Sequence, residues 1–159
     1  RIQTANVHPL KLLPDARDGA YVWSYTTNAP DFDWMQPEYD ASQWLTGDGG
    51  FGTAQPPGSI TRTLWNSSDI WLRREFVLPP GFRPPSFLTM YHDEDAEVYI
   101  NGVPAVSTRA YSTSYVEFQI ASEALKTLRP GRNVIAIYCH QTSGGQYIDA
   151  GLWSSIEGF

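Results

Sequence analysis

Short runs of apolar residues recur along the chain, and turn-forming residues separate them. In several runs the apolar side chains alternate with polar ones, which is the period-two pattern of a half-buried β-strand. Gly, Pro, Asn or Asp bounds each run. The runs are residues 21–25, 70–76, 87–92, 97–100, 115–120 and 133–140. This rhythm predicts an all-β fold, an antiparallel β-sandwich formed by residues 18–159 as a single module.

Two of the runs predict different surroundings. In residues 70–76 the apolar side chains share one face and Trp71, Arg73 and Glu75 share the other, so we expect that second face to contact water. Residues 133–139 are apolar on both faces, which predicts a central strand covered on each side. The side chains expected between the sheets are Leu72, Phe76, Leu88, Val98, Ile100, Phe118, Ile120, Val134, Ile135 and Ile137.

The segments between the runs carry turn signals. Asn101 and Gly102 suit the positive φ angles of a type I′ turn, so the next strand is expected to return antiparallel. Residues 1–17 contain two prolines and no sustained period, which predicts an extended lead-in packed on the domain. Helix is expected only as short turns at residues 40–44 and 122–128, each capped by its first residue.

Composition narrows the classes of protein. The chain has 159 residues, of which 42% are hydrophobic and 18% charged, and this supports one folded domain. A net charge of −6 with no basic run predicts no nucleic-acid partner. Cys139 is the single cysteine, so neither an intrachain disulfide nor a cysteine-built zinc site is available. No apolar stretch approaches the roughly 20 residues that span a bilayer, which predicts no membrane insertion.

The sequence contains no complete cofactor-binding or catalytic motif. Residues 47–52 match the glycine pattern of dinucleotide-binding loops, but the prolines that follow cannot continue as a helix, so a glycine-rich surface loop is expected. No nucleophile elbow is present, and Cys139 lies in an apolar strand where a thiol is usually inert. No carboxylate pair with glycosidase spacing can be identified, so we expect no catalysis, no catalytic residues and no cofactor.

Two polar runs follow apolar strands and are the candidate ligand contacts. Residues 92–95 place His, Asp, Glu and Asp together, which suits sugar hydroxyls, a structural calcium ion, or merely a solvated acidic turn. Residues 140–149 combine His, Gln, Tyr and Asp with flexible glycines, and they could instead satisfy buried backbone groups. The candidate contacts are His92, Asp93, Glu94, His140, Gln141, Gln146, Tyr147 and Asp149, with Trp65 as a stacking ring.

Four segments in order resemble the sugar-binding jelly-roll domain of glycoside hydrolase family two. They are residues 39–44, 69–79, 96–102 and 128–137. The resemblance implies a galactose-binding-like jelly-roll fold and a place in a larger secreted or periplasmic enzyme, with the catalytic domain of the same polypeptide as partner. The polar runs at 92–95 and 140–149 depart from the usual family pattern and are closer to modules appended to other bacterial hydrolases.

The sequence thus favours a non-catalytic module that binds carbohydrate or positions a substrate. The alternative is a structural module that packs against a catalytic domain and binds no sugar. A self-contained hydrolase is the third class. The first hypothesis requires the two polar runs to meet at one end of the sandwich and to line a shallow polar site.

Overall fold

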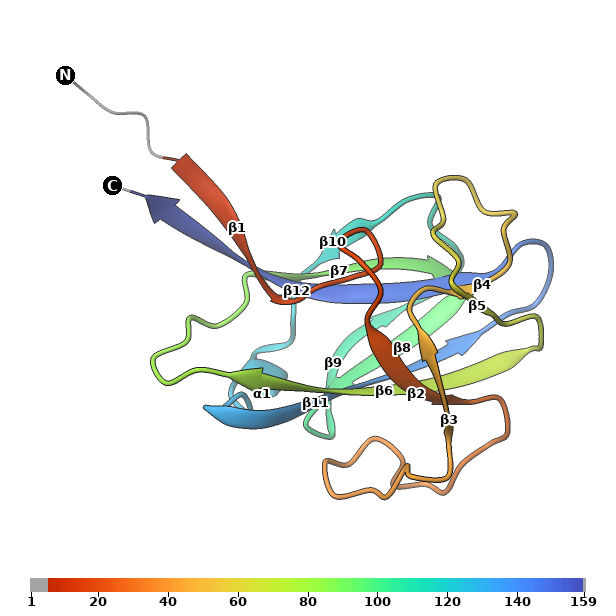
Figure 1. Cartoon of the computed structure of the whole chain (residues 1–159), viewed down its shortest axis with the longest axis horizontal. Helices are drawn as coiled ribbons and strands as arrows, with labels where there is room; N and C mark the ends of the chain where they lie inside the picture. The colour runs from red at the N-terminus through yellow and green to blue at the C-terminus, as the bar shows by residue number, and fades with distance from the viewer. Residues whose placement is uncertain (1–5, 159) are drawn as a thin grey trace.

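Two six-stranded β-sheets stack face to face in the computed structural model of the chain, which describes residues 6–158 (Figure 1). Sheet A has the strand order β10-β7-β12-β4-β5, with β1 also paired to β12. Sheet B has the order β3-β2-β6-β11-β8-β9. All pairs are antiparallel except β4 with β5. The predicted antiparallel jelly-roll sandwich is confirmed.

The elements in chain order are β1 (Asn6–Leu13), β2 (Val22–Thr26), β3 (Leu45–Asp48), β4 (Phe51–Gly52), β5 (Thr63–Leu64), β6 (Asp69–Leu78), β7 (Phe87–Asp93), β8 (Asp95–Ile100), β9 (Val103–Thr108), β10 (Val116–Phe118), α1 (Ser122–Leu125), β11 (Gly131–His140) and β12 (Tyr147–Gly158). Helix α1 is a single turn, and Ala121 rather than Ser122 stands at its N-cap position. No helix in the described part of the chain has the length and apolar character that crossing a membrane requires.

The core lies between the two sheets and follows the predicted alternation. Strand β11 pairs with β6 on one side and β8 on the other, so the expected central strand is confirmed. Ile135 and Ile137 belong to the buried cluster, and Phe118 is half-buried against it. Val134 is buried too, but period two places it on the opposite face of β11 from Ile135, outside the inter-sheet core.

The hairpin between β8 and β9 has the predicted turn. Asn101 and Gly102 both have positive φ, at 49° and 83°. The Asn101 side chain donates to the Thr127 carbonyl at 2.9 Å and accepts from the Val134 amide at 2.8 Å. The turn is therefore tied to the neighbouring strand and to the segment after α1.

The outer face of sheet B is less exposed to solvent than the alternation predicts. Arg73 is only 5% exposed, because residues 34–39 fold across this face and surround its guanidinium. Arg73 donates to the carbonyl oxygens of Trp34 and Gln36, both at 2.8 Å. The expectation of a wet face is wrong at Arg73, since an irregular segment and not solvent satisfies the buried charge.

In the glycine-rich segment at residues 47–52, residues 49–52 are buried and residues 47–48 are half-buried, so the segment is not a surface loop. It carries the chain from β3 in sheet B to β4 in sheet A. A Cβ atom at Gly50 would collide with the Tyr147 ring, and one at Gly52 would collide with the Gln146 backbone. The glycines are explained by close approach of backbone to side chains, and no helix follows them, so nothing here is built to hold a dinucleotide.

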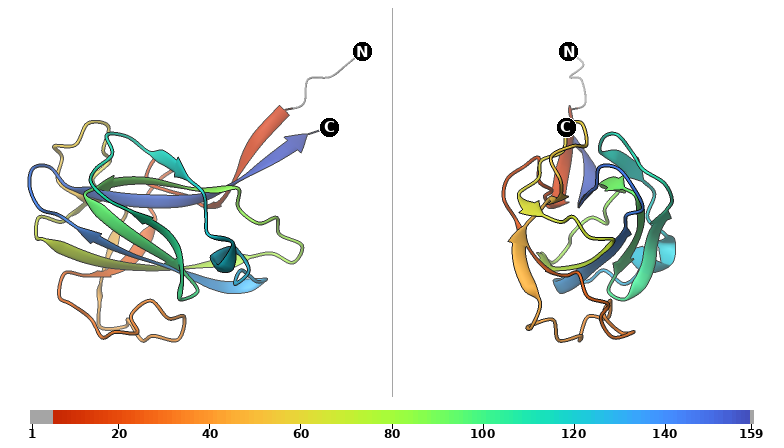
Figure 2. Two further views of the ribbon diagram at one scale, coloured as in Figure 1. Left: turned by 180° about the vertical axis from the view of Figure 1, so that it is seen from behind. Right: turned by 90° about the vertical axis from the view of Figure 1, so that its right-hand side faces the viewer.

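Within the predicted lead-in, residues 6–13 form strand β1. Strand β1 pairs antiparallel with β12, and the two leave the body of the sandwich together as a two-stranded ribbon (Figure 2). Residues 14–17 then cross from sheet A toward sheet B, and Asp15 and Ala16 are buried. Residues 1–5 and 159 lie outside the described part of the chain.

The central position of β11 predicts a large cost for truncating its inward side chains. We expect Ile135→Ala to lower the free energy of unfolding by about 2 to 5 kcal/mol, because Ile135 is fully buried. Val77→Ala is the matched control, since Val77 is 76% exposed and its truncation is expected to change stability by less than about 0.5 kcal/mol. Urea denaturation followed by circular dichroism measures both, and equal small losses would contradict the core assignment.

Candidate functional site

The two polar runs meet at one end of the sandwich, as predicted. Strand β7 ends at Asp93 and β11 ends at His140, and the Glu94 amide donates to the His140 carbonyl at 3.3 Å. This end lies opposite the ribbon of β1 and β12 (Figure 1). The strand ends therefore bring residues 93–95 and 140–145 side by side.

A shallow hollow opens at this end, which we call the end pocket. Its volume is about 260 Å³. Its lining is Asp93, Glu94, Tyr111, Ser143, Gly144 and Gly145. It thus combines two carboxylates, one aromatic ring and the backbone of a glycine-containing loop.

Glu94 is held by the loop that follows β11. One of its carboxylate oxygens, Oε1, accepts from the amides of Thr142 and Ser143 at 3.0 and 3.1 Å, and also from the Thr142 hydroxyl. The hydroxyl and then the amides favour the ionised form, and they hold the pKa of Glu94 below its usual range. Glu94 is therefore a fixed anion that orders the rim of the pocket.

Asp93 has a different environment from its neighbour. Partial burial, and then the charge of Glu94, raise the pKa of Asp93 to about 6. Among the residues that the structure describes, no group donates a hydrogen bond to its carboxylate. Asp93 is thus an acceptor that a ligand with hydroxyl or amino groups would satisfy.

Tyr111 supplies the aromatic surface of the end pocket. It is 63% exposed and forms an isolated antiparallel bridge with Asp93. The preceding residue, Ala110, has a positive φ of 63°, and its amide donates to Asp95 Oδ1 at 2.6 Å. The backbone on either side of the ring is therefore tied to the end of β7 and the start of β8.

Six of the predicted contacts are buried and do not line a shallow surface site. Trp65 is 1% exposed and donates through Nε1 to the Asp69 carbonyl, so it is a core ring and not a stacking platform. His92 lies with Nδ1 2.9 Å from the Glu94 carbonyl and 3.1 Å from the Ala110 carbonyl. The sequence pattern does not show that these side chains are buried, because burial depends on how the surrounding segments pack in the folded chain.

Gln141 and Gln146 are two more of the buried contacts. The Gln141 side chain donates to the Gly144 carbonyl at 3.0 Å, and its Oε1 atom is buried without a donor in the described region. Gln146 donates to the Ser67 carbonyl at 2.9 Å. Both amides brace the loops at this end of the sandwich.

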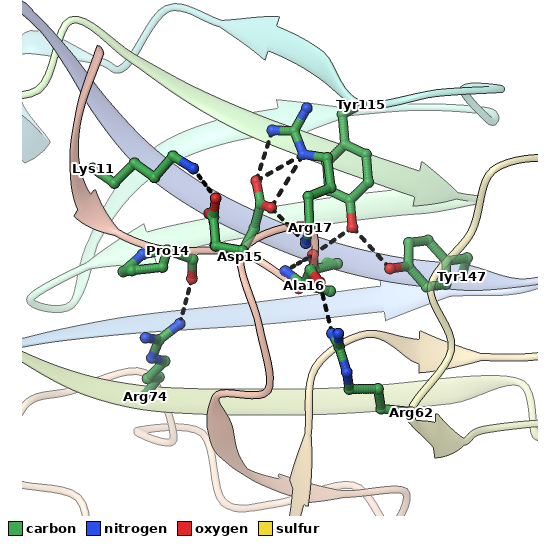
Figure 3. A network of polar contacts seen from close by, with 11 residues as sticks. Lys11, Pro14, Asp15, Ala16, Arg17, Arg62, Arg74, Tyr115 and Tyr147 are labelled. Atoms are coloured by element: carbon green, nitrogen blue, oxygen red, sulfur yellow. Dashed lines mark hydrogen bonds and ion pairs between the residues drawn. The ribbon is translucent and has the colours of Figure 1, made fainter. Parts of the chain in front are cut away.

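Tyr147 and Asp149 are also inside, 0% and 2% exposed, and the prediction that they line the surface site is corrected. The Tyr115 hydroxyl donates to Asp149 Oδ2 at 2.6 Å, and the Ala16 amide donates to the same oxygen at 2.8 Å. The hydroxyl oxygens of Tyr115 and Tyr147 are 2.8 Å apart. Figure 3 shows the Tyr115 and Tyr147 hydroxyls beside Ala16, in the segment that follows β1.

Arginine side chains complete this buried network. Arg62 donates to the Ala16 carbonyl at 2.7 Å, and Arg74 donates to the Pro14 carbonyl at 2.8 Å (Figure 3). Arg17 pairs with the buried Asp15 carboxylate, and its guanidinium lies 4.0 Å from the centre of the Tyr115 ring. The network joins β12 to three irregular segments and is structural.

His140 remains at the surface beside the end pocket. Its Nδ1 atom lies 2.7 Å from Asp69 Oδ1, and the same carboxylate oxygen accepts from the Tyr138 hydroxyl at 2.6 Å. Burial opposes ionisation of Asp69, but hydrogen bonds from Tyr138, His140 and Ser68 outweigh it and lower its pKa. Asp93, Glu94 and His140 are therefore the predicted contacts that the structure leaves accessible.

The described residues contain no cluster of His, Cys, Asp or Glu side chains for the structural calcium ion that the sequence left open. No group of three or more His, Cys, Asp or Glu side chains within residues 6–158 is arranged to hold a metal ion. The Glu94 oxygen that faces the loop is occupied by hydrogen bonds from that loop. Cys139 is buried, and burial raises the pKa of its thiol, as expected for an inert cysteine.

Sequence reasoning missed Tyr111 and Tyr115. Tyr111 lies in a polar stretch with no periodic pattern, and Tyr115 begins the predicted run at 115–120, just before β10; the surroundings of both rings depend on contacts with other strands. The local signal is an aromatic residue within or at the end of a small and polar loop. That signal cannot separate the exposed ring of Tyr111 from the buried one of Tyr115.

The buried Asp149 predicts an inverted pH dependence of stability. Burial raises its pKa to about 7, against the hydrogen bonds from Tyr115 and Ala16, which favour the ionised form. The folded chain then binds more protons than the unfolded chain between about pH 4 and 7, so this group's contribution to stability falls as the pH rises through that window.

Asp149→Asn is the test, because the amide keeps an acceptor for Tyr115 and Ala16 but does not titrate. Between about pH 4 and 7, we expect the wild type to lose about 1 to 4 kcal/mol of unfolding free energy relative to this variant. Chemical denaturation at several pH values measures the difference. Parallel curves for the two proteins would show that Asp149 is ionised throughout.

Comparisons with known proteins identify the fold. No protein-family model matches the sequence, and no curated protein does. A β-glucuronidase from glycoside hydrolase family 2 aligns with a TM-score of 0.60 at 16% identity, covering 96% of this chain and 18% of that one. A glycoside hydrolase family 2 member from Bacteroides cellulosilyticus aligns at 0.58 and 14% identity, covering 84% of this chain and 20% of that one.

A β-glucuronidase from an uncultured Clostridium species aligns with a TM-score of 0.53 at 8% identity, covering 97% of this chain and 30% of that one. At sequence identities this low, the structural alignments establish a shared fold alone. The chain thus spans less than a third of the length of these proteins. It has the fold of one domain found in glycoside hydrolase family 2 enzymes, as the resemblance in the sequence predicted.

Proposed function

We propose that the chain is a non-catalytic module of a larger, secreted or periplasmic glycoside hydrolase, and that it binds or positions carbohydrate at the end pocket. The observation that carries the proposal is the fold, which recurs as a minor part of much longer family 2 glycosidases. The end pocket adds the chemistry, because it places an exposed ring beside carboxylate acceptors. The catalytic domain of the same polypeptide is the expected partner.

The arrangement favours binding over hydrolysis. Asp93 and Glu94 are consecutive residues on one rim of a shallow hollow, whereas glycosidase carboxylates flank the scissile bond inside a cleft. Glu94 is engaged by the loop that it orders, which leaves Asp93 as the acceptor for a sugar hydroxyl. The Tyr111 ring offers an apolar face for the C–H groups of a pyranose.

A buttress role is the second candidate, and exposed apolar side chains favour it. Phe32 is 91% exposed, although the segment that follows it is anchored by Arg73. A large apolar side chain in such a position suits contact with another protein surface. Under this alternative the domain would pack against a catalytic domain and bind no sugar.

A carbohydrate-binding measurement distinguishes the binding role from the buttress role. We expect a glycan array to identify a carbohydrate bound by the chain with a Kd around 10⁻⁵ to 10⁻³ M, because water competes for each hydroxyl of an exposed site. Tyr111→Ala and Asp93→Asn are each expected to weaken that binding about tenfold in isothermal titration calorimetry. Val77→Ala is the control with unchanged affinity. Absence of binding to any glycan would leave the buttress role.

The raised pKa of Asp93 predicts how this binding depends on pH. A sugar hydroxyl donates more strongly to the ionised carboxylate, so affinity is expected to rise between about pH 5 and 7, as Asp93 ionises near its pKa of about 6. Asp93→Asn is expected to remove that rise. Calorimetric titrations of the array-selected glycan across the range measure it, and a flat wild-type profile would exclude Asp93 as the acceptor.

A further inference from the structure

A second hollow lies next to the end pocket, on the outer face of sheet B. Its volume is about 180 Å³, and we call it the side pocket. Six of its lining residues carry the argument, and they are Asp95, Glu97, Ser107, Arg109, Tyr138 and His140. It is lined from β8, β9, the segment after β9, and the end of β11.

The two pockets flank one ridge. Glu94 lines the end pocket and the adjacent Asp95 lines the side pocket. On the other strand, His140 lines the side pocket, and Ser143 three residues later lines the end pocket. The bond from the Glu94 amide to the His140 carbonyl ties the two halves of the ridge together. A chain-like ligand that crosses this ridge would contact both pockets.

Tyr138 gives the side pocket a fixed aromatic wall. Its ring centre lies 5.1 Å from that of Trp71 on β6, with 31° between the ring planes. Its hydroxyl donates to Asp69 at 2.6 Å, which fixes the ring from its far end. An aromatic side chain that is held in place before binding loses little entropy when a sugar packs on it.

His140 presents an acceptor to the same pocket. Hydrogen bonds hold the Asp69 carboxylate ionised, so the His140 Nδ1 atom, 2.7 Å away, must carry the proton and donate to it. In the neutral imidazole the proton on Nδ1 leaves Nε2 as the acceptor. Nε2 has no partner among the residues that the structure describes. A hydroxyl group of a ligand in the side pocket would supply the missing donor.

The charges around the ridge select against an anionic sugar. Asp93, Glu94, Asp95 and Glu97 line the two pockets, and Arg109 is the cation that lines the side pocket. The Arg109 side chain is 81% exposed and its guanidinium lies 3.5 Å from the Asp95 carboxylate, which partly neutralises its positive charge. Most groups offered to a ligand are acceptors, which suits hydroxyl donors and repels a carboxylate.

We propose that the side pocket is a second sugar subsite, so that the module takes a neutral oligosaccharide of two or more units across the ridge and rejects uronic-acid chains. Tyr138 packs against one sugar ring and His140 Nε2 accepts from its hydroxyl. The inference rests on the proposed function, because it assigns a substrate class and an additional subsite to the same end of the module.

The test uses calorimetric titrations of the wild-type chain with xylotetraose, cellotetraose, mannotetraose and galactotetraose, the four corresponding monosaccharides, and tetragalacturonate. At least one neutral tetraose is expected to bind about tenfold or more tightly than its monosaccharide, and also more tightly than tetragalacturonate. Tyr138→Ala and His140→Ala are expected to weaken the tetraose about tenfold. Tyr39→Ala, which removes a ring from a different hollow on the same face, is the matched control.

Folding defects are separated from loss of the subsite by two further measurements. Tyr138→Phe keeps the ring and loses only the bond to Asp69, so it is expected to retain most tetraose affinity. The imidazole signals of His140 in NMR spectra, assigned with His140→Ala, are expected to shift when the wild-type chain binds the tetraose.

The binding results distinguish failure of the subsite from failure of the proposed function. Unchanged tetraose binding by both alanine variants, or tighter binding of tetragalacturonate than of every neutral tetraose, would overturn this inference and leave the proposed function standing. Failure of the wild-type chain to bind any glycan, on the array or in this panel, would overturn the proposed function and the subsite with it.

Discussion

A buried carboxylate on β12 is the constraint on which the rest of the structure depends. Asp149 lies on the outer face of sheet A, where it accepts hydrogen bonds from the Ala16 amide and from the Tyr115 hydroxyl. A buried carboxyl group without donors would cost several kcal/mol, so the segments that supply those donors must be in place for the sheet to be stable. The crossing segment at residues 14–17 and the loop before β10 are thereby coupled to the core strand.

In both sheets, irregular segments cover polar or aromatic side chains on the outer face. On sheet A the tyrosine rings at 91, 115 and 147 pack edge to face, under the segments that surround Asp149. On sheet B the Arg73 guanidinium collects carbonyl oxygens from residues 34–39. Irregular segments, which would otherwise be exposed loops, therefore cover a large part of each outer face. The accessible hollows that remain at the sandwich end opposite the ribbon are the end pocket and the side pocket.

The sandwich end that carries the two pockets combines side chains held by hydrogen bonds with acceptors that have no donor among the described residues. Glu94 and Asp69 are fixed by hydrogen bonds, and they in turn fix the loop after β11 and the His140 ring. Asp93 and His140 Nε2 lack partners in the described part of the chain. Fixed surroundings with free acceptors are the arrangement that a weak but selective polyol site requires, because the protein loses little freedom on binding.

The sequence by itself determined the sandwich. Alternation in residues 70–76, the doubly apolar run at 133–139 and the Asn101–Gly102 turn were sufficient for the place of β6, the central strand β11 and one hairpin. Each of these depends on contacts that a strand makes with its immediate neighbours. The meeting of the two polar runs was also predictable, since sandwich loops gather at only two ends.

Only the tertiary structure decided which polar residues are accessible. Residues 140–149 read as one polar loop, yet Tyr147 and Asp149 belong to β12 and are buried, while His140 stays at the surface. The difference arises because residues 16 and 115, distant in the sequence, cover Asp149, whereas the described residues leave the His140 side chain 38% exposed. Periodicity specifies the face on which a side chain lies, and long-range packing specifies whether that face meets water.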